Sequence, residues 1–368
     1  MEDNNEINDM VNNFNSESNY EQNEEEEEDI INMNQINQIF HYNPAEYEND
    51  YIINKLFEMQ ILKKEPICEK CGGKMKLEND NQYLDKIVWR CRSKNPKHDV
   101  KRNIRVNSVY EIFNVPLFIL YFLTFECFSL NKKINKSLID VKDLCSQLGK
   151  PTTTKRVIIK LFRTLREKLR IFMHKVWSNN PLGSEPAENG VPRIEIDESE
   201  IIGNQNNKIW MFGLIDRVDK EARVFCVMND RTKENLLPII ERNVLTNDIG
   251  NNWNLKTRIY SDCYASYQPN DFEERGYILH RVNHSVWFGQ GLFHTNTVEG
   301  LWSKIKRLSN NFSGITMNYV NELQNEGINI KNYFDGWICY SLFQRNIEKN
   351  QLSTSNSKNY LSEYLKIN

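Results

Sequence analysis

The segment HTNTVEGLWSKIKR, residues 294–307, decides how the second half of the chain is expected to fold. Thr295 or Thr297 can cap a helix, because a threonine hydroxyl accepts a hydrogen bond from an N–H group of the first turn. Apolar residues then recur every three or four positions, as they do on one face of a helix. They are Val298, Leu301, Trp302, Ile305 and Leu308. The segment therefore predicts an amphipathic helix with Glu299 in its first turn.

One acidic residue at a helix start is weak evidence for a site, because the helix dipole alone favours glutamate there. Two further acids stand at the ends of β-patterned runs, Asp197 in RIEIDESEII (193–202) and Asp262 in TRIYSDCYASY (257–267). Three carboxylates on three ordered elements are the minimum for a magnesium site, since Mg²⁺ prefers oxygen ligands. Glu198 is left out of this set, because strand alternation points it to the opposite face from Asp197.

The elements expected around these acids follow a recognisable order. Residues 181–192 are rich in Pro, Gly and Asn and form a plausible linker. After it we expect three strands, a helix, a strand, a second strand and the helix of residue 299. The strands are expected at 193–202, 210–218, 222–228, 257–261 and 277–282, with the first helix at 232–245. This order predicts an α/β RNase H-like catalytic domain at 193–315, in which acids cluster at neighbouring strand ends.

Charge is unevenly distributed along the 368 residues. Residues 1–50 contain 15 acidic residues and no Lys or Arg, so the remainder holds 35 acidic and 47 basic residues, a net charge of +12. A basic body of this kind is typical of proteins that bind polyanions. The Asn/Glu-rich tail has too few apolar groups to offset the entropy of ordering, and we expect it to be a disordered, solubilising segment.

Membrane insertion and secretion are not expected. The N-terminus is acidic and polar, unlike a signal peptide. The most apolar segment, 115–130, is short for a membrane span and contains Glu126, so it predicts a buried core helix. The eight cysteines are scattered and do not suggest a disulfide framework. The sequence predicts a soluble, intracellular protein.

Residues 60–110 contain a metal-ligand pattern. Cys68 and Cys71 form a CxxC motif followed by two glycines, a knuckle that directs two sulfurs towards one ion. Cys91 and His98 would complete a Cys₃His set for a structural Zn²⁺ ion in a zinc-ribbon-like module. In the alternative, the CxxC is a reducible pair and Cys91 and His98 are incidental. Basic residues nearby suit either DNA phosphates or a solvated surface: Lys94, Lys97, Lys101, Arg102 and Arg105.

Residues 111–180 predict a basic helical region, with 13 basic and 3 acidic residues between positions 131 and 175. Within it, LCSQLGKPTTTKRVIIKLF (144–162) predicts two helices joined by a turn at 149–151, in the manner of a helix-turn-helix. The alternative is a basic helical pair that packs without reading bases. Residues 316–368 form a C-terminal helical tail, in which NYFDGWICYSLFQRN (332–346) suits a helix packed on the catalytic core. The DNA-binding candidates are Lys155, Arg156, Lys160 and Arg163, with Lys304, Lys306 and Arg307 on the later helix.

The three acids fit metal-assisted phosphodiester chemistry, which needs no protein nucleophile. Two Mg²⁺ (or Mn²⁺) ions about 4 Å apart can activate an attacking oxygen and neutralise a leaving oxygen. In this hypothesis Asp197 bridges both ions, while Asp262 and Glu299 each hold one of them.

Polar residues near the acids are supporting candidates. His294 and Asn296 directly precede the helix and could orient water or phosphate. A structural loop histidine is an equally good interpretation of His294. Asn283 and His284, in RVNHS, have the same two interpretations.

Four segments, in this order, resemble one known family: IEIDES (194–199), YSDCYASY (260–267), RVNHS (281–285) and HTNTVEGLWSKIKR. They are similar to DDE transposases of the Merlin superfamily and their bacterial insertion-sequence relatives, the ISXO-like transposases. The 36 residues between Asp262 and Glu299 are the spacing typical of that superfamily's second and third acids. The CxxC with WRCR (89–92) also resembles the family's zinc ribbon, and the resemblance covers about residues 60–345.

The resemblance implies a cut-and-paste transposase that binds terminal inverted repeats, cleaves the ends and joins the 3′-hydroxyls to target DNA. It carries catalytic roles to Asp197, Asp262 and Glu299, with two divalent ions for each active site. Synapsis of two ends implies at least a dimer. DNA as substrate implies the nucleus in a eukaryote, or the cytoplasm in a bacterium. The chain departs from the family where NPKH (95–98) replaces a usual cysteine, and in its acidic extension.

Three other functions remain open at this stage. A domesticated DNA-binding protein would keep the ribbon and basic helices without catalysis. A structure-specific nuclease of the same fold would cut DNA without joining it. A zinc-binding interaction module would leave the C-terminal half unexplained.

Overall fold

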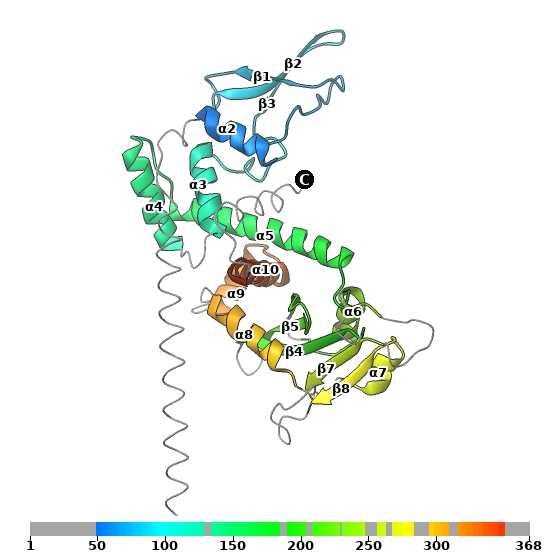
Figure 1. Ribbon diagram of the computed structural model, residues 1–368. Helices are drawn as coiled ribbons and strands as arrows, with labels where there is room; N and C mark the ends of the chain where they lie inside the picture. Colours follow the sequence, from blue (N-terminus) through cyan, green and yellow to red (C-terminus); the bar gives the residue numbers. More distant parts are fainter. Residues whose placement is uncertain are drawn as a thin grey trace, which may run out of the picture.

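The computed structural model describes residues 49–128, 134–184, 190–203, 208–228, 230–246, 256–262, 267–282, 294–308 and 316–349 (Figure 1). Almost all of the predicted acidic tail, residues 1–48, lies outside this part, as do Asn283 and His284. The side chains of Arg307 and Leu308 also lie outside it.

A small module forms the N-terminal part of the described chain. Its antiparallel sheet has the order β1 (Lys76–Asn79), β2 (Ile87–Lys94) and β3 (Lys97–Asn103). Helix α2 (Asn49–Glu58) covers this sheet and was not predicted from the sequence. Its apolar positions lie on one face, and the Phe57 ring meets the Trp89 ring edge-on with centroids 6.0 Å apart.

Three helices follow: α3 (Leu117–Phe128), α4 (Ile134–Gln147) and α5 (Lys155–Asn179). The predicted core helix is confirmed, because α3 is buried almost all round and even Glu126 is 3% exposed. No described helix is both long and apolar enough to cross a bilayer. The turn between α4 and α5 is present, with Gly149 at φ +60°. Helix α5 is a 25-residue helix whose N-terminal end is exposed and whose later turns are packed against α10.

The larger sheet has the strand order β6-β5-β4-β7-β8, with β4 at its centre. Strands β4 (Arg193–Gly203), β5 (Lys208–Asp216) and β6 (Ala222–Met228) are antiparallel neighbours. Strands β7 (Arg258–Asp262) and β8 (Ile278–Val282) continue the sheet in parallel with β4. Helix α6 (Lys233–Asn243) follows β6, as predicted, and α7 (Pro269–Glu273) is a short helix in the connection between β7 and β8. The element order is therefore the one expected of an RNase H-like fold.

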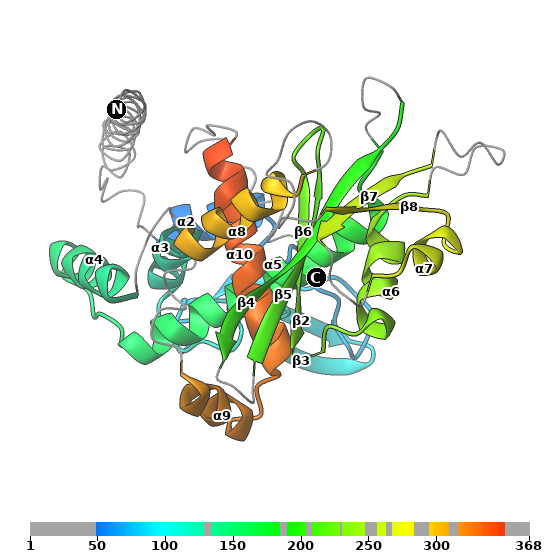
Figure 2. The ribbon, with the colours of Figure 1, turned by 90° about the horizontal axis from the view of Figure 1, so that it is seen from below.

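Helices cover both faces of this sheet, because alternate strand residues are apolar on each side. Figure 2 shows α8 (Asn296–Leu308) and α10 (Ile330–Lys349) on one side of the sheet and α6 and α7 on the other. Ile194 and Ile196 pack with α6 and α7, whereas Met211 and Ile215 pack with α8 and α10. After α9 (Met317–Asn325), α10 contacts α5, β6 and α8. The prediction that the aromatic C-terminal segment packs back on the core is confirmed.

A buried ion pair joins the small module to the helical region. Arg105 is 1% exposed and donates two hydrogen bonds of 2.6 Å to the Asp85 carboxylate. It also donates to the carbonyls of Phe113 (2.6 Å) and Val115 (2.8 Å), at the entry to α3. The suggestion that Arg105 could contact DNA is therefore wrong, because its guanidinium is enclosed and already paired.

We expect Asp85→Ala to lower the free energy of unfolding by about 3–5 kcal/mol, because it leaves a buried guanidinium without its counter-ion. Urea unfolding followed by circular dichroism measures this loss. Glu65→Ala is the matched control, since its partner Lys74 forms an exposed pair with it, and it should change stability little. A loss below about 1 kcal/mol for Asp85→Ala would contradict a structural role for the pair.

Candidate active site and metal centre

Asp197 and Asp262 come together through the parallel pairing of β4 and β7. The register pairs Ile194 with Ile259 and Glu195 with Tyr260. Continued by two residues, it places Asp197 beside Asp262 at the last residue of β7. Side chains at paired positions of neighbouring strands point to the same face. The two acids therefore share one face of the sheet, the face that α8 covers.

Glu299 reaches this face from the first turn of α8. Thr295 stands at the cap position, because its carbonyl accepts the first helical hydrogen bond, from Glu299 N at 3.2 Å. The Thr295 hydroxyl also donates to Glu299 Oε1 at 3.1 Å, which orients the carboxylate. The predicted inward face of this helix is confirmed for Val298, Leu301, Trp302 and Ile305, all buried.

Trp302 links α8 directly to Asp197. Its indole Nε1–H donates to Asp197 Oδ2 at 2.7 Å. The indole fits because the residue opposite Asp197 on β5 is Gly213. A Cβ atom at Gly213 would lie 2.4 Å from Cη2 of the Trp302 ring. The glycine thus leaves room for the ring to lie against the sheet and reach the carboxylate.

Glu195 holds the start of α8 against the sheet, and sequence reasoning missed it. Its carboxylate is fully buried and accepts a hydrogen bond from Val298 N at 2.9 Å, one of the free N–H groups at the helix start. Arg217 Nε donates to its other oxygen at 2.6 Å. The Arg217 guanidinium stacks on the Tyr260 ring at 3.7 Å and also donates to the carbonyl of His294. The alternation in RIEID, which puts Glu195 on the same face as Asp197, was the available signal.

The acids influence each other electrostatically. Burial raises the pKa of Asp197 to about 6, the charges of Asp262 and Glu299 add to the shift, and the hydrogen bond from Trp302 opposes it. Burial and the charges of Asp197 and Asp262 also raise the pKa of Glu198 to about 8. Glu198 lies on the opposite face, as expected, with Arg231 Nη1 at 3.8 Å from its Oε2. It is therefore a fourth acid close to the other three, although it is not on their face.

The residues predicted to bind zinc do come together. The ligand atoms of Cys68, Cys71, Cys91 and His98 all lie within 4.8 Å of one another. The Sγ atoms of Cys71 and Cys91 are 3.6 Å apart, and His98 Nε2 lies 3.4 Å from Cys91 Sγ. Tetrahedral Zn–S bonds of about 2.3 Å imply sulfurs roughly 3.8 Å apart, so the group has the size of a zinc site. Asp197, Asp262 and Glu299 do not form so tight a group among the described residues.

The backbone prepares the four ligands. The knuckle closes through Cys68 N to the carbonyl of Gly73 and Gly72 N to the carbonyl of Cys68, each 2.8 Å. The β2–β3 hairpin pairs Ser93 with His98, which brings the imidazole next to Cys91. His98 Nδ1 lies 2.9 Å from the Pro96 carbonyl, so a proton there leaves Nε2 available to a metal.

Two of the thiols differ in ease of ionisation. Burial opposes ionisation of Cys68, but hydrogen bonds from the backbone of Lys70 and Cys71 outweigh it and lower the thiol pKa to about 7. Burial and the neighbouring sulfurs raise the pKa of Cys91 to about 12. The Cys₃His donor set is one that zinc takes in structural sites.

Comparison with known proteins agrees with this architecture. Residues 185–326 match the family model of the ISXO2-like transposase domain. The chain carries an ISXO2-like transposase domain. Such a domain implies an RNase H-like α/β fold, and the strand order β6-β5-β4-β7-β8 lies within the matched residues. A search of curated proteins finds no match to the chain.

Within the transposase domain, the two supporting candidates occupy different environments. His294 Nδ1 lies 3.5 Å from Glu195 Oε1, and its carbonyl accepts from Arg217. Burial and the charge of Arg217 lower the His294 pKa. These contacts favour the structural interpretation of this histidine. Asn296 is exposed at the first residue of α8 and can reach a ligand from solvent.

The DNA-binding candidates lie on two surfaces. Lys155 and Arg156 are exposed at the start of α5, and Lys304 and Lys306 are exposed on α8. Lys160 lies 3.4 Å from the Ile112 carbonyl. Arg163 Nη1 lies 3.8 Å from Glu326 Oε2.

The two helices and the turn predicted within 144–162 are present as α4 and α5. Their use as a helix-turn-helix in DNA recognition stays a prediction.

We expect Gly213→Ala to displace Trp302 from Asp197, because the added methyl group overlaps the indole. Such overpacking lowers the free energy of unfolding by about 1–3 kcal/mol, and the fluorescence of the tryptophans should shift. The matched control is Gly300→Ala, on an exposed helical position where a Cβ meets nothing within 4 Å. This control should be neutral or stabilising, by up to about 1 kcal/mol. Equal effects of both substitutions would contradict the fit between Gly213 and Trp302.

We expect Cys71→Ser to remove bound zinc from the purified protein, measured as metal content by atomic absorption. Cys71 is the exposed member of the group, so the substitution itself leaves no cavity in the core. Cys145→Ser, on α4, is the control and should keep the wild-type metal content. Unchanged zinc in the Cys71 variant, or none in the wild type, would count against the zinc centre.

Proposed function

We propose that this protein is a metal-dependent DDE transposase that cleaves DNA at transposon ends and joins them to target DNA. The observation that carries the proposal is the position of Asp197 and Asp262 on adjacent parallel strands, close enough to Glu299 of α8 that both charges act on Asp197. The match to the transposase domain family supports the same class of reaction.

In this proposal Asp197 would contact two divalent cations, Mg²⁺ or Mn²⁺, while Asp262 and Glu299 would each contact one. When bound, two such ions activate the attacking oxygen and neutralise charge on the leaving oxygen. Oxygen donors of carboxylates are the ligands that these hard cations prefer. Burial and the acidic neighbours raise the pKa of Asp197, and a bound cation would favour its ionised form.

The remaining residues of the site position the acids. Trp302 donates to one oxygen of Asp197 and so orients this carboxylate. Glu195 and Arg217 hold the start of α8, and Thr295 orients Glu299. Catalysis of phosphoryl transfer depends mainly on positioning and electrostatics, so these contacts would contribute without touching substrate.

DNA would be held outside this centre. The exposed cations Lys155 and Arg156 at the start of α5, and Lys304 and Lys306 on α8, are suited to phosphate contacts. We further propose that the Cys₃His group holds a structural zinc ion, which would order the N-terminal module for binding transposon ends. Two ends must be held together for cut-and-paste transposition, so we expect a dimer or larger assembly on DNA.

We expect Glu299→Gln to abolish DNA cleavage while leaving DNA affinity within about twofold, because it removes a metal ligand and no phosphate contact. Cleavage and strand transfer are measured on labelled DNA carrying the element's flanking repeats, with magnesium, manganese or EDTA. Glu322→Gln, on exposed α9, is the matched control and should cleave like wild type.

Asp262→Asn should behave like Glu299→Gln in the same assay. Cleavage near the wild-type rate by either variant would remove that residue from the site. Binding of the repeats without cleavage under either metal would favour a domesticated DNA-binding protein. Cleavage without joined products would favour a nuclease of the same fold.

A further inference from the structure

A second group of charged side chains lies between α5 and α10. It does not include Asp197, Asp262 or Glu299. Four arginines of the described residues are buried: Arg105, Arg166, Arg223 and Arg345. Three of them donate hydrogen bonds to carboxylates or to backbone carbonyls. Arg166, which is 6% exposed, makes no hydrogen bond or ion pair within the described part of the chain.

The contact that Arg166 does make leaves its donors unused. Its guanidinium lies over the Trp337 ring, with 3.7 Å between the central carbon and the ring centroid. Stacking of this kind uses the face of the guanidinium and leaves the N–H groups in its plane available. No Arg166 nitrogen is among the enclosed, unpaired polar atoms of the described residues, so these N–H groups reach the space beside the side chain.

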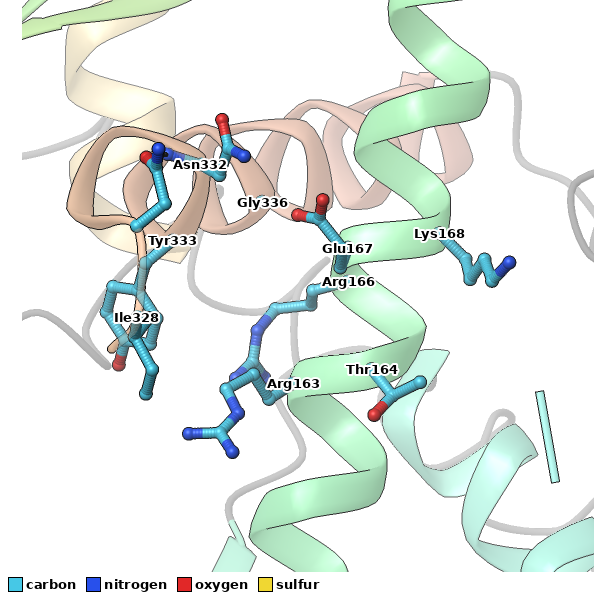
Figure 3. A pocket seen from close by; sticks show the side chains of 10 residues that line it. Arg163, Thr164, Arg166, Glu167, Lys168, Ile328, Asn332, Tyr333 and Gly336 are labelled. Carbon is cyan, nitrogen blue, oxygen red and sulfur yellow. Dashed lines mark hydrogen bonds between the residues drawn. The ribbon is translucent and has the colours of Figure 1, made fainter. Parts of the chain in front are cut away.

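Space for a ligand exists beside this side chain. A pocket of about 330 Å³ is lined by residues of α5 and of the α9–α10 segment, including Arg163, Arg166, Asn329, Asn332 and Tyr333. Figure 3 shows Arg163 and Arg166 extending from α5 towards the side where Ile328 and Tyr333 lie. Gly336 contributes no side chain to fill the space, and a Cβ atom at this position would lie 3.6 Å from the Cβ of Arg166.

The charge balance of the pocket is positive. Glu167 lines it, but both of its oxygens accept hydrogen bonds from Arg170, at 2.9 and 2.7 Å. Glu326 lies 3.8 Å from Arg163 in an exposed pair, which is weak. The pocket therefore presents two guanidinium groups whose charge is not balanced by the acids around them.

We propose that this pocket binds a phosphate group, with Arg166 as its central contact and Arg163 at its rim. A planar guanidinium donates two parallel hydrogen bonds to a phosphate, and the polar side chains of Asn329 and Asn332 can complete the set. The phosphate would take the place of the water around the Arg166 guanidinium. Arg105 is paired in a comparable way with the Asp85 carboxylate. The proposal does not rest on the catalytic function of the carboxylates.

The phosphate can come from two sources. Arg166 follows Lys155 by eleven residues, which is about three turns of helix and places both on nearly the same side of α5. A DNA strand whose phosphates meet Lys155 could therefore continue to the pocket. The other source is a free phosphate or a mononucleotide, for which the pocket is large enough.

The experiment compares the full-length protein with Arg166→Met and with Lys175→Met, a control on the same helix whose exposed side chain does not line the pocket. In the first arm, inorganic phosphate replaces chloride at constant ionic strength, and thermal unfolding is followed. Phosphate should raise the unfolding midpoint of the wild type and of Lys175→Met and should leave that of Arg166→Met unchanged, because only a ligand of the native state stabilises it.

In the second arm, fluorescence anisotropy measures binding of a labelled duplex of arbitrary sequence over a series of salt concentrations. If the phosphate belongs to DNA, Arg166→Met should weaken duplex binding by about tenfold. The slope of log K against log salt concentration should fall by about one, as expected for the loss of one phosphate contact. Loss of the phosphate response with unchanged duplex affinity identifies a free phosphate as the ligand. The proposal is overturned when Arg166→Met matches the wild type in both arms.

A second variant covers the case in which Arg166→Met does not fold. Arg163 has a side chain 38% exposed, so Arg163→Gln should keep the fold. It should weaken phosphate or duplex binding by about threefold, because it removes one charged contact at the rim. An unchanged response of this variant to phosphate and to DNA would equally overturn the proposal.

Discussion

The hydrogen bonds of the buried Glu195 carboxylate join the central strand of the sheet to the start of α8. One oxygen accepts from the backbone of Val298 and the other from Arg217. A fully buried carboxylate is stable only while its donors stay in place. Helix α8 therefore cannot slide or rotate without leaving a charge unpaired. That constraint sets the height and rotation of the first turn, and with it the position of Glu299 relative to Asp197.

The same sheet face depends on helices outside the matched transposase domain. Helix α10 begins after residue 326, yet Asp335 on it accepts a 2.6 Å hydrogen bond from the backbone of Cys226 on β6. Burial raises the pKa of Asp335 to about 6, so this contact ties α10 to the sheet at an enclosed position. Helix α5 packs against α10 in turn. The domain therefore shares one continuous core with the helices that flank it in sequence.

Much of this fold could be predicted from the sequence, because its signals are local. The strand runs, the capped helix of Glu299 and the CxxC knuckle each depend on residues close in sequence. What could not be predicted depends on contacts between distant segments. Glu195 accepts a hydrogen bond from Val298, which is 103 residues away in the sequence. A side chain at Gly213 is excluded only because the Trp302 ring packs over that position. In the sequence, Arg105 stands among other basic residues. Its pairing with Asp85 and with two backbone carbonyls is visible only in the folded chain.

The two candidate metal groups differ in compactness and in the charge of their ligands. The ligand atoms of the Cys₃His group lie within 4.8 Å of one another, and neutral thiols and imidazole do not repel. Carboxylates near one another repel, and the acids around Asp197 raise its pKa while staying farther apart. The scaffold nevertheless keeps Asp197 in place through Trp302, and α8 through Glu195. In the proposed reaction, a cation at these acids would reduce their mutual repulsion and favour the ionised form of Asp197.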